Sequence, residues 1–348
     1  MPSAIIEHVP AGAPPKVIGP ATKRATRPTN KLPQSLIDSA RIPDPVTFDH
    51  RRHLAFEPPK NIYTMKDIGL EGHGISPHAV SEPFPLFTKE AIRQMRAEVF
   101  SDQAMEHCQY SSSFTKNMIR GIGPDRAPFI YDAWHSPEVL AKISEVAGID
   151  LIPIMDYDVG NTNVSIDDSP KDIITTKKPS DDDVTAVAWH YDSVPFVCVL
   201  MLSDCTNMVG GETAVRTASG DIMKVRGPTM GTAVVMQGRY IEHQALKAFG
   251  GRERITMVTS FRPKSPFVKD ETVLTGVRGI SDLSGLYTQY SRYRLEVLEE
   301  RIRHKLKTEN RRQVTKRPFD IPEMRKFLTE QKQFIESMIE EIYEVDDD

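Results

Sequence analysis

The sequence predicts an all-β core with α-helices flanking it at both ends, folded as one globular domain. Residues 151–266 consist of short apolar runs separated by turn signals, a texture typical of strands. Residues 61–150 and 267–348 instead place apolar side chains at helical spacing. Residues 1–60 hold 11 of the 26 prolines. Four regions are therefore expected: an N-terminal arm, a helical support region, a jelly-roll or similar β core and a C-terminal helical hairpin.

The proline-dense segment 1–60 is expected to lie over the body as an extended arm, because proline removes a backbone donor and disfavours helices and central strands. In 61–150 a helix is predicted over 87–107, with Thr88 as its N-cap. A second helix is predicted from Pro137, with Ser136 as the N-cap and Gly148 as its end.

Eight short strands are predicted in 151–266, and their number and spacing favour a sandwich, a barrel or a jelly roll. They are 151–158, 185–192, 195–202, 212–217, 221–225, 232–236, 239–243 and 254–263. The polar stretch "DDSPKDIITTKKPSDDD" (167–183) interrupts them. It is too charged to be core, so a surface insertion near the mouth of the barrel is expected.

After residue 280 the spacing of Leu286, Tyr290, Tyr293 and Val297 predicts an amphipathic helix, and a second helix follows it. This hairpin is expected to buttress the core, and a homodimer formed through it is the alternative that stays open. Residues 301–317 contain eight Lys or Arg and one Glu. Because no aromatic residues are interleaved to stack on bases, we interpret them as a solvated helix face and not as a nucleic-acid site.

Bulk properties exclude several functional classes. The net charge of −4 and the 26% charged residues give no reason to expect nucleic acid or a membrane as a partner. No apolar run reaches the roughly 18 residues of a membrane span. Three cysteines without a CxxC pair argue against a disulfide framework. The N-terminus lacks the pattern of a secretory signal, so a cytoplasmic location is expected.

The chemistry is suggested by "AVAWHYD" (186–192). In a strand, His190 and Asp192 would project from the same face, and "RYIEHQA" supplies His243 on a later strand. Two neutral imidazoles and one carboxylate suit Fe(II) and leave coordination positions open. Arg254 could hold the far carboxylate of a 2-oxo acid through its planar fork, with Thr256 on the same strand face. Arg252 is the rival for this contact.

These residues resemble the signature of the Fe(II)/2-oxoglutarate-dependent dioxygenases, and "GGETAV" (210–215) is similar to the turn and strand that follow the first ligands there. The resemblance covers roughly residues 151–263. It implies a double-stranded β-helix, a form of jelly roll, with iron on His190, Asp192 and His243. It also implies that 2-oxoglutarate and O2 are co-substrates. Decarboxylation of 2-oxoglutarate would be coupled to hydroxylation, desaturation or cyclisation of a small-molecule substrate.

The family often places a polar side chain from an early core strand against 2-oxoglutarate. Tyr157, Asn161 and Asn163 are the candidates, and Asn163 is preferred because it leads into the core. The ends of the chain are similar to fungal secondary-metabolism oxygenases that act on small amino acids. Two alternatives are a non-catalytic, cupin-like metal- or ligand-binding module and a metal-dependent hydrolase. The first predicts a fourth protein ligand or no arginine, and the second an additional general base.

Overall fold

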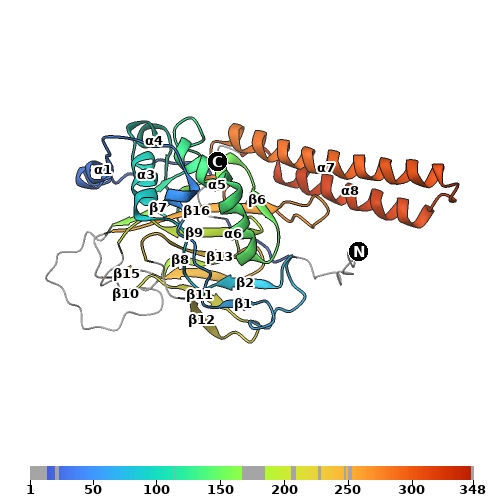
Figure 1. Ribbon diagram of the computed structural model, residues 1–348, viewed down its shortest axis with the longest axis horizontal. Helices are drawn as coiled ribbons and strands as arrows, with labels where there is room; N and C mark the ends of the chain where they lie inside the picture. Colours follow the sequence, from blue (N-terminus) through green and yellow to red (C-terminus); the bar gives the residue numbers. More distant parts are fainter. Residues whose placement is uncertain are drawn as a thin grey trace.

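Two antiparallel β-sheets with helices on the outside form the body of the protein (Figure 1). The computed structural model describes residues 14–19, 23–113, 115–166, 185–204, 209–225, 229–246, 248–249 and 253–345. In 185–188, 209 and 248–249 it describes the backbone alone. The predicted insertion 167–183 and Arg252 lie outside the described residues.

The larger sheet has ten strands and forms the centre of the body. Its main order is β1 (Ile62–Thr64), β2 (His78–Ser81), β13 (Thr232–Met236), β9 (Phe196–Met201), β16 (Glu253–Pro263), β7 (Asn161–Ile166), β5 (Met118–Ile119) and β4 (Gln109–Tyr110). β3 (Phe84–Pro85) pairs with β13, and β6 (Leu151–Pro153) pairs with β16.

The smaller sheet has four strands in the order β12 (Ile222–Val225), β11 (Thr213–Arg216), β14 (His243–Leu246) and β8 (Thr185–His190). β10 (Val209–Gly210) and β15 (Ala248–Phe249) form a separate pair. From β7 onward the chain moves repeatedly between sheets: β7, β9, β13 and β16 belong to the larger one, and β8, β11, β12 and β14 to the smaller one.

Strand alternation divides the apolar side chains of the larger sheet between two cores. On one face, Leu200, Ile255 and Met257 pack in a cluster with Ile92 of α3 (Lys89–Val99) and Trp134 of α5 (Pro128–His135). On the other face, side chains of the larger sheet pack against side chains of the smaller sheet. This second cluster joins Val197, Val234 and Met236 to Val215 and Val225. The space between the sheets is therefore a packed interior, and the metal candidates lie at its edge.

Side chains cap two helices of the support region, but Ser136, the predicted N-cap of a third, makes no side-chain hydrogen bond to the backbone of its helix. Thr88 accepts a hydrogen bond from the Ala91 N–H and begins α3. The helix predicted over 87–107 divides at Phe100, and Ser101 caps α4 (Asp102–His107). α6 (Pro137–Ala147) has proline in its first turn and ends at Gly148, whose φ of 70° is left-handed. Figure 1 shows α3 to α6 on one side of the larger sheet.

Two regions contain structure that the sequence patterns did not predict. Residues 14–19 and 23–60 include two short helices, α1 (Gln34–Ala40) and α2 (His50–His53), where only an extended path was predicted. Pro33 precedes α1, so the proline lies where its missing N–H costs nothing. The region 61–150 also contains five short strands, β1 to β5, that join the larger sheet. Their side chains are too few to reveal a period of two.

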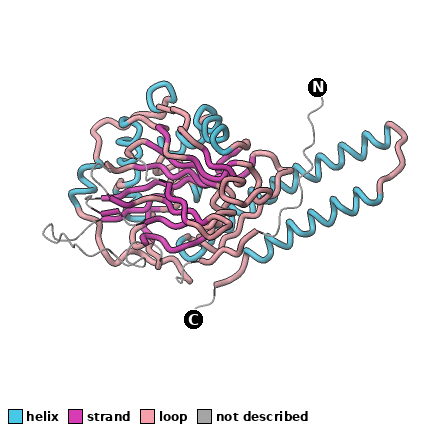
Figure 2. The backbone as a smooth tube through the Cα atoms, turned by 90° about the horizontal axis from the view of Figure 1, so that it is seen from below, coloured by secondary structure: helices cyan, strands magenta, loops and turns pink. Residues whose placement is uncertain are grey.

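The C-terminal hairpin consists of α7 (Leu283–Val314) and α8 (Ile321–Glu341). Asp282 caps α7 by accepting a hydrogen bond from the Gly285 N–H. Leu286, Tyr290 and Val297 are buried against the inter-sheet core, as the sequence predicts. Figure 2 shows the far part of both helices extending well away from the sheets. Among the described helices none combines the length and apolar character needed to cross a membrane.

Candidate metal centre

Two histidines face each other across neighbouring strands of the smaller sheet. His190 is the last residue of β8 and His243 the first residue of β14, and the two are direct partners in the antiparallel register. Paired residues project from the same face of a sheet. The centroids of the two rings are accordingly 4.3 Å apart. The predicted strand 239–243 is wrong in its bounds, because residues 238–240 form a turn and the strand begins at His243.

Asp192 reaches the same point from beyond the end of β8. The sequence predicts it within the strand, but the backbone has already turned there, and the Asp192 N–H donates to the carbonyl of Gly238. Its Oδ1 lies 3.5 Å from His190 Nε2 and 3.6 Å from His243 Nε2. Its Oδ2 is buried and has no hydrogen-bond partner among the described residues. One carboxylate oxygen thus faces both imidazoles.

This donor set fits a divalent transition metal. The three side chains each offer one ligand atom, and these atoms all lie within 4.8 Å of one another. His243 Nδ1 is 2.9 Å from the carbonyl oxygen of Ile241. Because a carbonyl only accepts hydrogen bonds, Nδ1 carries the proton and Nε2 presents its lone pair toward Asp192. Two imidazoles and one carboxylate are the ligands that non-haem Fe(II) prefers.

Electrostatics prepare both kinds of ligand for a cation. Burial acts to raise the pKa of the Asp192 carboxyl, but the imidazoles of His243 and His190 outweigh it and hold that pKa below its ordinary value. Burial lowers the pKa of His243 to about 4, against the opposing attraction of Asp192. At neutral pH the site therefore presents an ionised carboxylate and a neutral His243 imidazole, the forms that bind metal.

The depressed pKa of His243 predicts a pH-dependent stability of the metal-free protein. Between pH 4 and 6.5 the unfolded chain binds a proton at this position that the folded chain does not, so stability should rise as pH increases through that window. The expected gain is at most about 3 kcal/mol. Urea unfolding of the metal-free wild type and of His243→Gln measures it. Equal slopes of stability against pH in the two proteins would contradict the assignment.

Arg254 and Thr256 point into the space between the sheets. Their neighbours Ile255 and Met257 pack toward the helices, so the alternate residues of β16 face the smaller sheet. Arg254 Nη2 accordingly reaches across to the carbonyl oxygen of Gly211, at 3.4 Å. Gly211 comes four residues before Val215, the register partner of His243. Arg254 thus contacts the chain just before β11, the strand that pairs with β14.

Asn163 lies beside Thr256, whereas Tyr157 lies elsewhere. Asn163 and Thr256 are register partners in β7 and β16, so both side chains face the inter-sheet space. Asn163 makes no side-chain hydrogen bond to any described residue. Asn161, in contrast, is turned to Asp158, to which its Nδ2 donates at 2.8 Å. The Asn161 amide is thus already bound to Asp158, and the preference for Asn163 stays a prediction.

Tyr157 lies beyond the opposite end of β7 from Arg254, whose register partner is Ser165. Its hydroxyl accepts the Asp282 N–H at 2.7 Å and shares a hydrogen bond with the Tyr110 hydroxyl at 3.0 Å. Burial is the main cause that raises the pKa of Tyr157 well above its ordinary value. This tyrosine joins the body to the start of α7, so we remove it from the set of candidate co-substrate contacts.

The structure adds one residue that the sequence motif did not indicate. A Cβ atom built on Gly238 would lie 1.8 Å from Asp192 Oδ2, so the carboxylate rests directly against this glycine. The φ of Gly238 is not left-handed, and only the close approach requires the absence of a side chain. Nothing in "MQGRY" (236–240) distinguishes this glycine from an ordinary turn residue.

Comparison with solved structures gives neighbours of low similarity. One is an oxidoreductase of the 2OG-Fe(II) oxygenase family from Burkholderia pseudomallei, with a TM-score of 0.31 and 15% identity over 42% of this chain. This chain spans 65% of the length of that protein. A prolyl-4-hydroxylase from Pseudomonas putida gives a TM-score of 0.28 and 19% identity over 51% of this chain and 88% of its own.

A third neighbour is AviO1 from Streptomyces viridochromogenes Tue57, with a TM-score of 0.35 and 16% identity over 54% of this chain and 90% of its own. No model of a protein family matches the sequence, and no curated protein matches it. At these TM-scores the likeness assigns neither activity nor substrate, and the functional argument depends on the residues themselves.

Proposed function

We propose that this chain is a non-haem Fe(II) oxygenase that couples decarboxylation of 2-oxoglutarate to oxidation of a C–H bond in a small-molecule substrate. The observation that carries the proposal is the convergence of His190, Asp192 and His243 at one edge of the inter-sheet space. When bound, Fe(II) would supply the redox chemistry by which O2 reacts. The protein contributes three ligands and leaves the remaining coordination positions to the co-substrates.

The remaining residues support a role for 2-oxoglutarate. Arg254, which points into the inter-sheet space, would hold the second carboxylate of 2-oxoglutarate through its planar fork of donors. Thr256 and Asn163 add polar groups on the same face. The alternation of the chain between two four-strand sets also supports a double-stranded β-helix as the core.

The finer assignments go beyond these contacts. Hydroxylation, desaturation and ring closure require the same metal ligands, so the triad does not distinguish them. A small amino acid of secondary metabolism is the substrate class suggested by the resemblance of the chain ends. The cupin-like alternative has no support in a fourth ligand, because the described residues bring only three to the site.

Anaerobic absorption spectroscopy tests the proposed function. We expect a visible charge-transfer band when Fe(II) and 2-oxoglutarate are added together, and its loss in Asp192→Ala, because the variant removes the only anionic ligand. Circular dichroism of both proteins controls for folding. A well-folded, metal-replete wild type without the band would favour the binding-module alternative, and a band that persists in Asp192→Ala would remove this residue from the site.

A further inference from the structure

The second helix of the C-terminal hairpin carries two apolar faces. The inner face packs against α7 through Phe327, Phe334 and Met338, of which the last two are buried. A second stripe is exposed to solvent, with Ile321, Leu328, Ile335 and Ile342 at every seventh residue and Ile339 between them. Their exposed fractions range from 38% to 68%. At about 100° per residue, this stripe lies roughly 90° from the inner face.

The first helix of the hairpin carries a matching stripe. Its side toward α8 is marked by Arg294 and Arg301, whose guanidiniums lie 3.6 and 4.4 Å from the ring centroid of Phe334. Leu295, Ile302 and Leu306 are rotated from that side by roughly 90° in the same sense as the stripe of α8. They are 55%, 43% and 59% exposed.

The two stripes form one surface. Because α7 and α8 are antiparallel, rotations of the same sense from their mutual contact bring both stripes to the same side of the hairpin. We define the hairpin face as this surface. It comprises Leu295, Ile302, Leu306, Leu328, Ile335 and Ile339. A helix that packs against one neighbour needs only one apolar face. A second apolar face that is exposed to solvent indicates a second partner.

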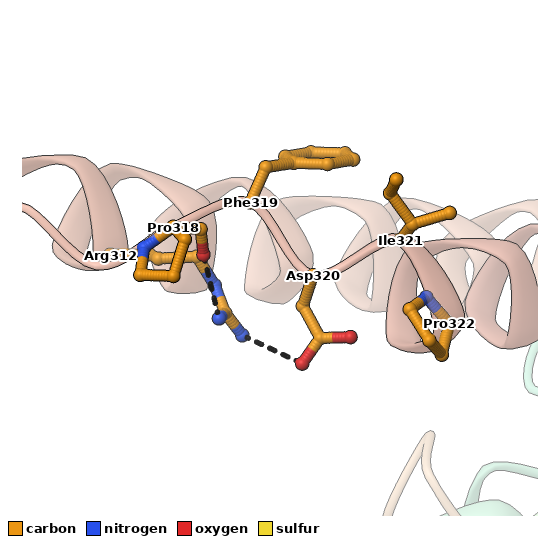
Figure 3. A pocket seen from close by; sticks show the side chains of 6 residues that line it. All are labelled: Arg312, Pro318, Phe319, Asp320, Ile321 and Pro322. Atoms are coloured by element: carbon orange, nitrogen blue, oxygen red, sulfur yellow. Dashed lines mark hydrogen bonds and ion pairs between the residues drawn. The ribbon is translucent and has the colours of Figure 1, made fainter.

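The hairpin face lies where a partner has access. Figures 1 and 2 show the outer part of α7 and α8 projecting beyond the sheets, with no other described element beside it. At the tip, Phe319 and Ile321 remain exposed beside a shallow notch that they line together with Arg312 and Pro318. Figure 3 shows both apolar side chains pointing away from the ion pair of Arg312 with Asp320.

Charge indicates which partner fits. Residues 301–317, at the outer end, contain eight Lys or Arg and one Glu. Residues 330–345, in the half of α8 nearer the body and just after it, contain one Lys and five Glu. One end of the hairpin is therefore basic and the other acidic. An anionic membrane would attract the tip and repel the base, whereas an identical hairpin in the opposite direction complements both.

We propose that the hairpin face pairs with the same face of a second copy of this chain, in a two-fold homodimer with antiparallel hairpins. Four helices then form a bundle that buries the exposed stripes, and the basic tip of each copy lies over the acidic base of the other. This arrangement is compatible with a two-fold axis, because the same face is used by both copies and every contact occurs twice. The proposal is independent of the oxygenase function.

Sedimentation velocity of the full chain, from about 1 to 100 µM, tests the pairing. The wild type is expected to be dimeric, and Ile302→Glu and Ile335→Glu should each weaken the dimer at least about 100-fold, because each change buries two unpaired carboxylates in the two-fold interface. Ile222→Glu is the matched control. Ile222 is 55% exposed on β12 in the smaller sheet, and its replacement should leave the dimer unchanged.

Circular dichroism of each variant confirms folding, which is expected because all three positions are exposed. A wild type that stays monomeric throughout the range overturns the proposal, as does a dimer that survives both hairpin variants. A monomer that binds anionic vesicles through the same residues assigns the face to a membrane and also overturns it. Raising NaCl from about 0.05 to 0.5 M should weaken the dimer, because salt screens the opposite charges. A tighter dimer at the higher NaCl concentration would overturn the antiparallel arrangement.

Discussion

Replacing Gly238 by alanine is expected to lower the affinity for Fe(II) by about 10- to 100-fold although all three ligands remain. The added methyl group would lie 1.8 Å from Asp192 Oδ2, so the carboxylate has to rotate away from His190 and His243. Titration with Fe(II) or Co(II) under anaerobic conditions measures the loss. The free energy of unfolding of the metal-free protein should change far less, because Gly238 does not have a left-handed φ.

Two controls isolate the effect of Gly238 on the ligand. Gly220→Ala changes a glycine that does have a left-handed φ, 88°, and whose added Cβ would meet no atom within 4 Å. It should cost stability but leave metal affinity intact. In an Asp192→Ala background, Gly238→Ala should cause no further loss, because the clashing carboxylate is gone. A further loss in that background would show that Gly238 acts on something other than Asp192.

Replacing Arg254 by lysine is expected to weaken 2-oxoglutarate binding by about 30-fold, equivalent to about 2 kcal/mol for a charge-assisted hydrogen bond. Lysine keeps the positive charge but lacks the planar fork that binds both carboxylate oxygens. The apparent KM for the primary substrate should change much less. Titration of the Fe(II) protein with 2-oxoglutarate, followed through the charge-transfer band, gives the affinity directly.

A second arginine of the same strand provides the comparison for Arg254. Arg262 lies at the other end of β16, with its guanidinium 5.2 Å from the ring centroid of Tyr293 in α7. Arg262→Lys should leave 2-oxoglutarate affinity unchanged. If Arg254→Lys affects both substrates equally, or affects neither, then Arg254 is not the anchor, and the inter-sheet position of the co-substrate has to be reconsidered.

The local sequence was sufficient to predict those features that depend on near neighbours along the chain. Thr88 caps α3 and Gly148 ends α6, because caps are satisfied by groups within four residues. The buried stripe of Leu286, Tyr290 and Val297 follows from helical periodicity alone. The motif of His190, Asp192 and His243 identified the three residues that converge, because their side-chain chemistry is specific even when their geometry is unknown.

Features that join distant segments of the chain could be recognised only in the folded protein. Strand periodicity misplaced Asp192. The position of Asp192 is fixed by a hydrogen bond to Gly238, in the turn after β13, and not by the pleat of β8. Tyr157 and Asn163 were both candidates in sequence, with Asn163 preferred, but pairing of β7 with β16 brings only Asn163 beside Thr256.

The hairpin face likewise appears only once α7 and α8 pack together, because the register between two helices sets which apolar stripe is covered. Side-chain chemistry and periodicity along the chain therefore specify the proposed metal ligands and the presence of the helices. The folded chain determined which of these groups meet, because those contacts depend on strand and helix pairing across long separations along the chain.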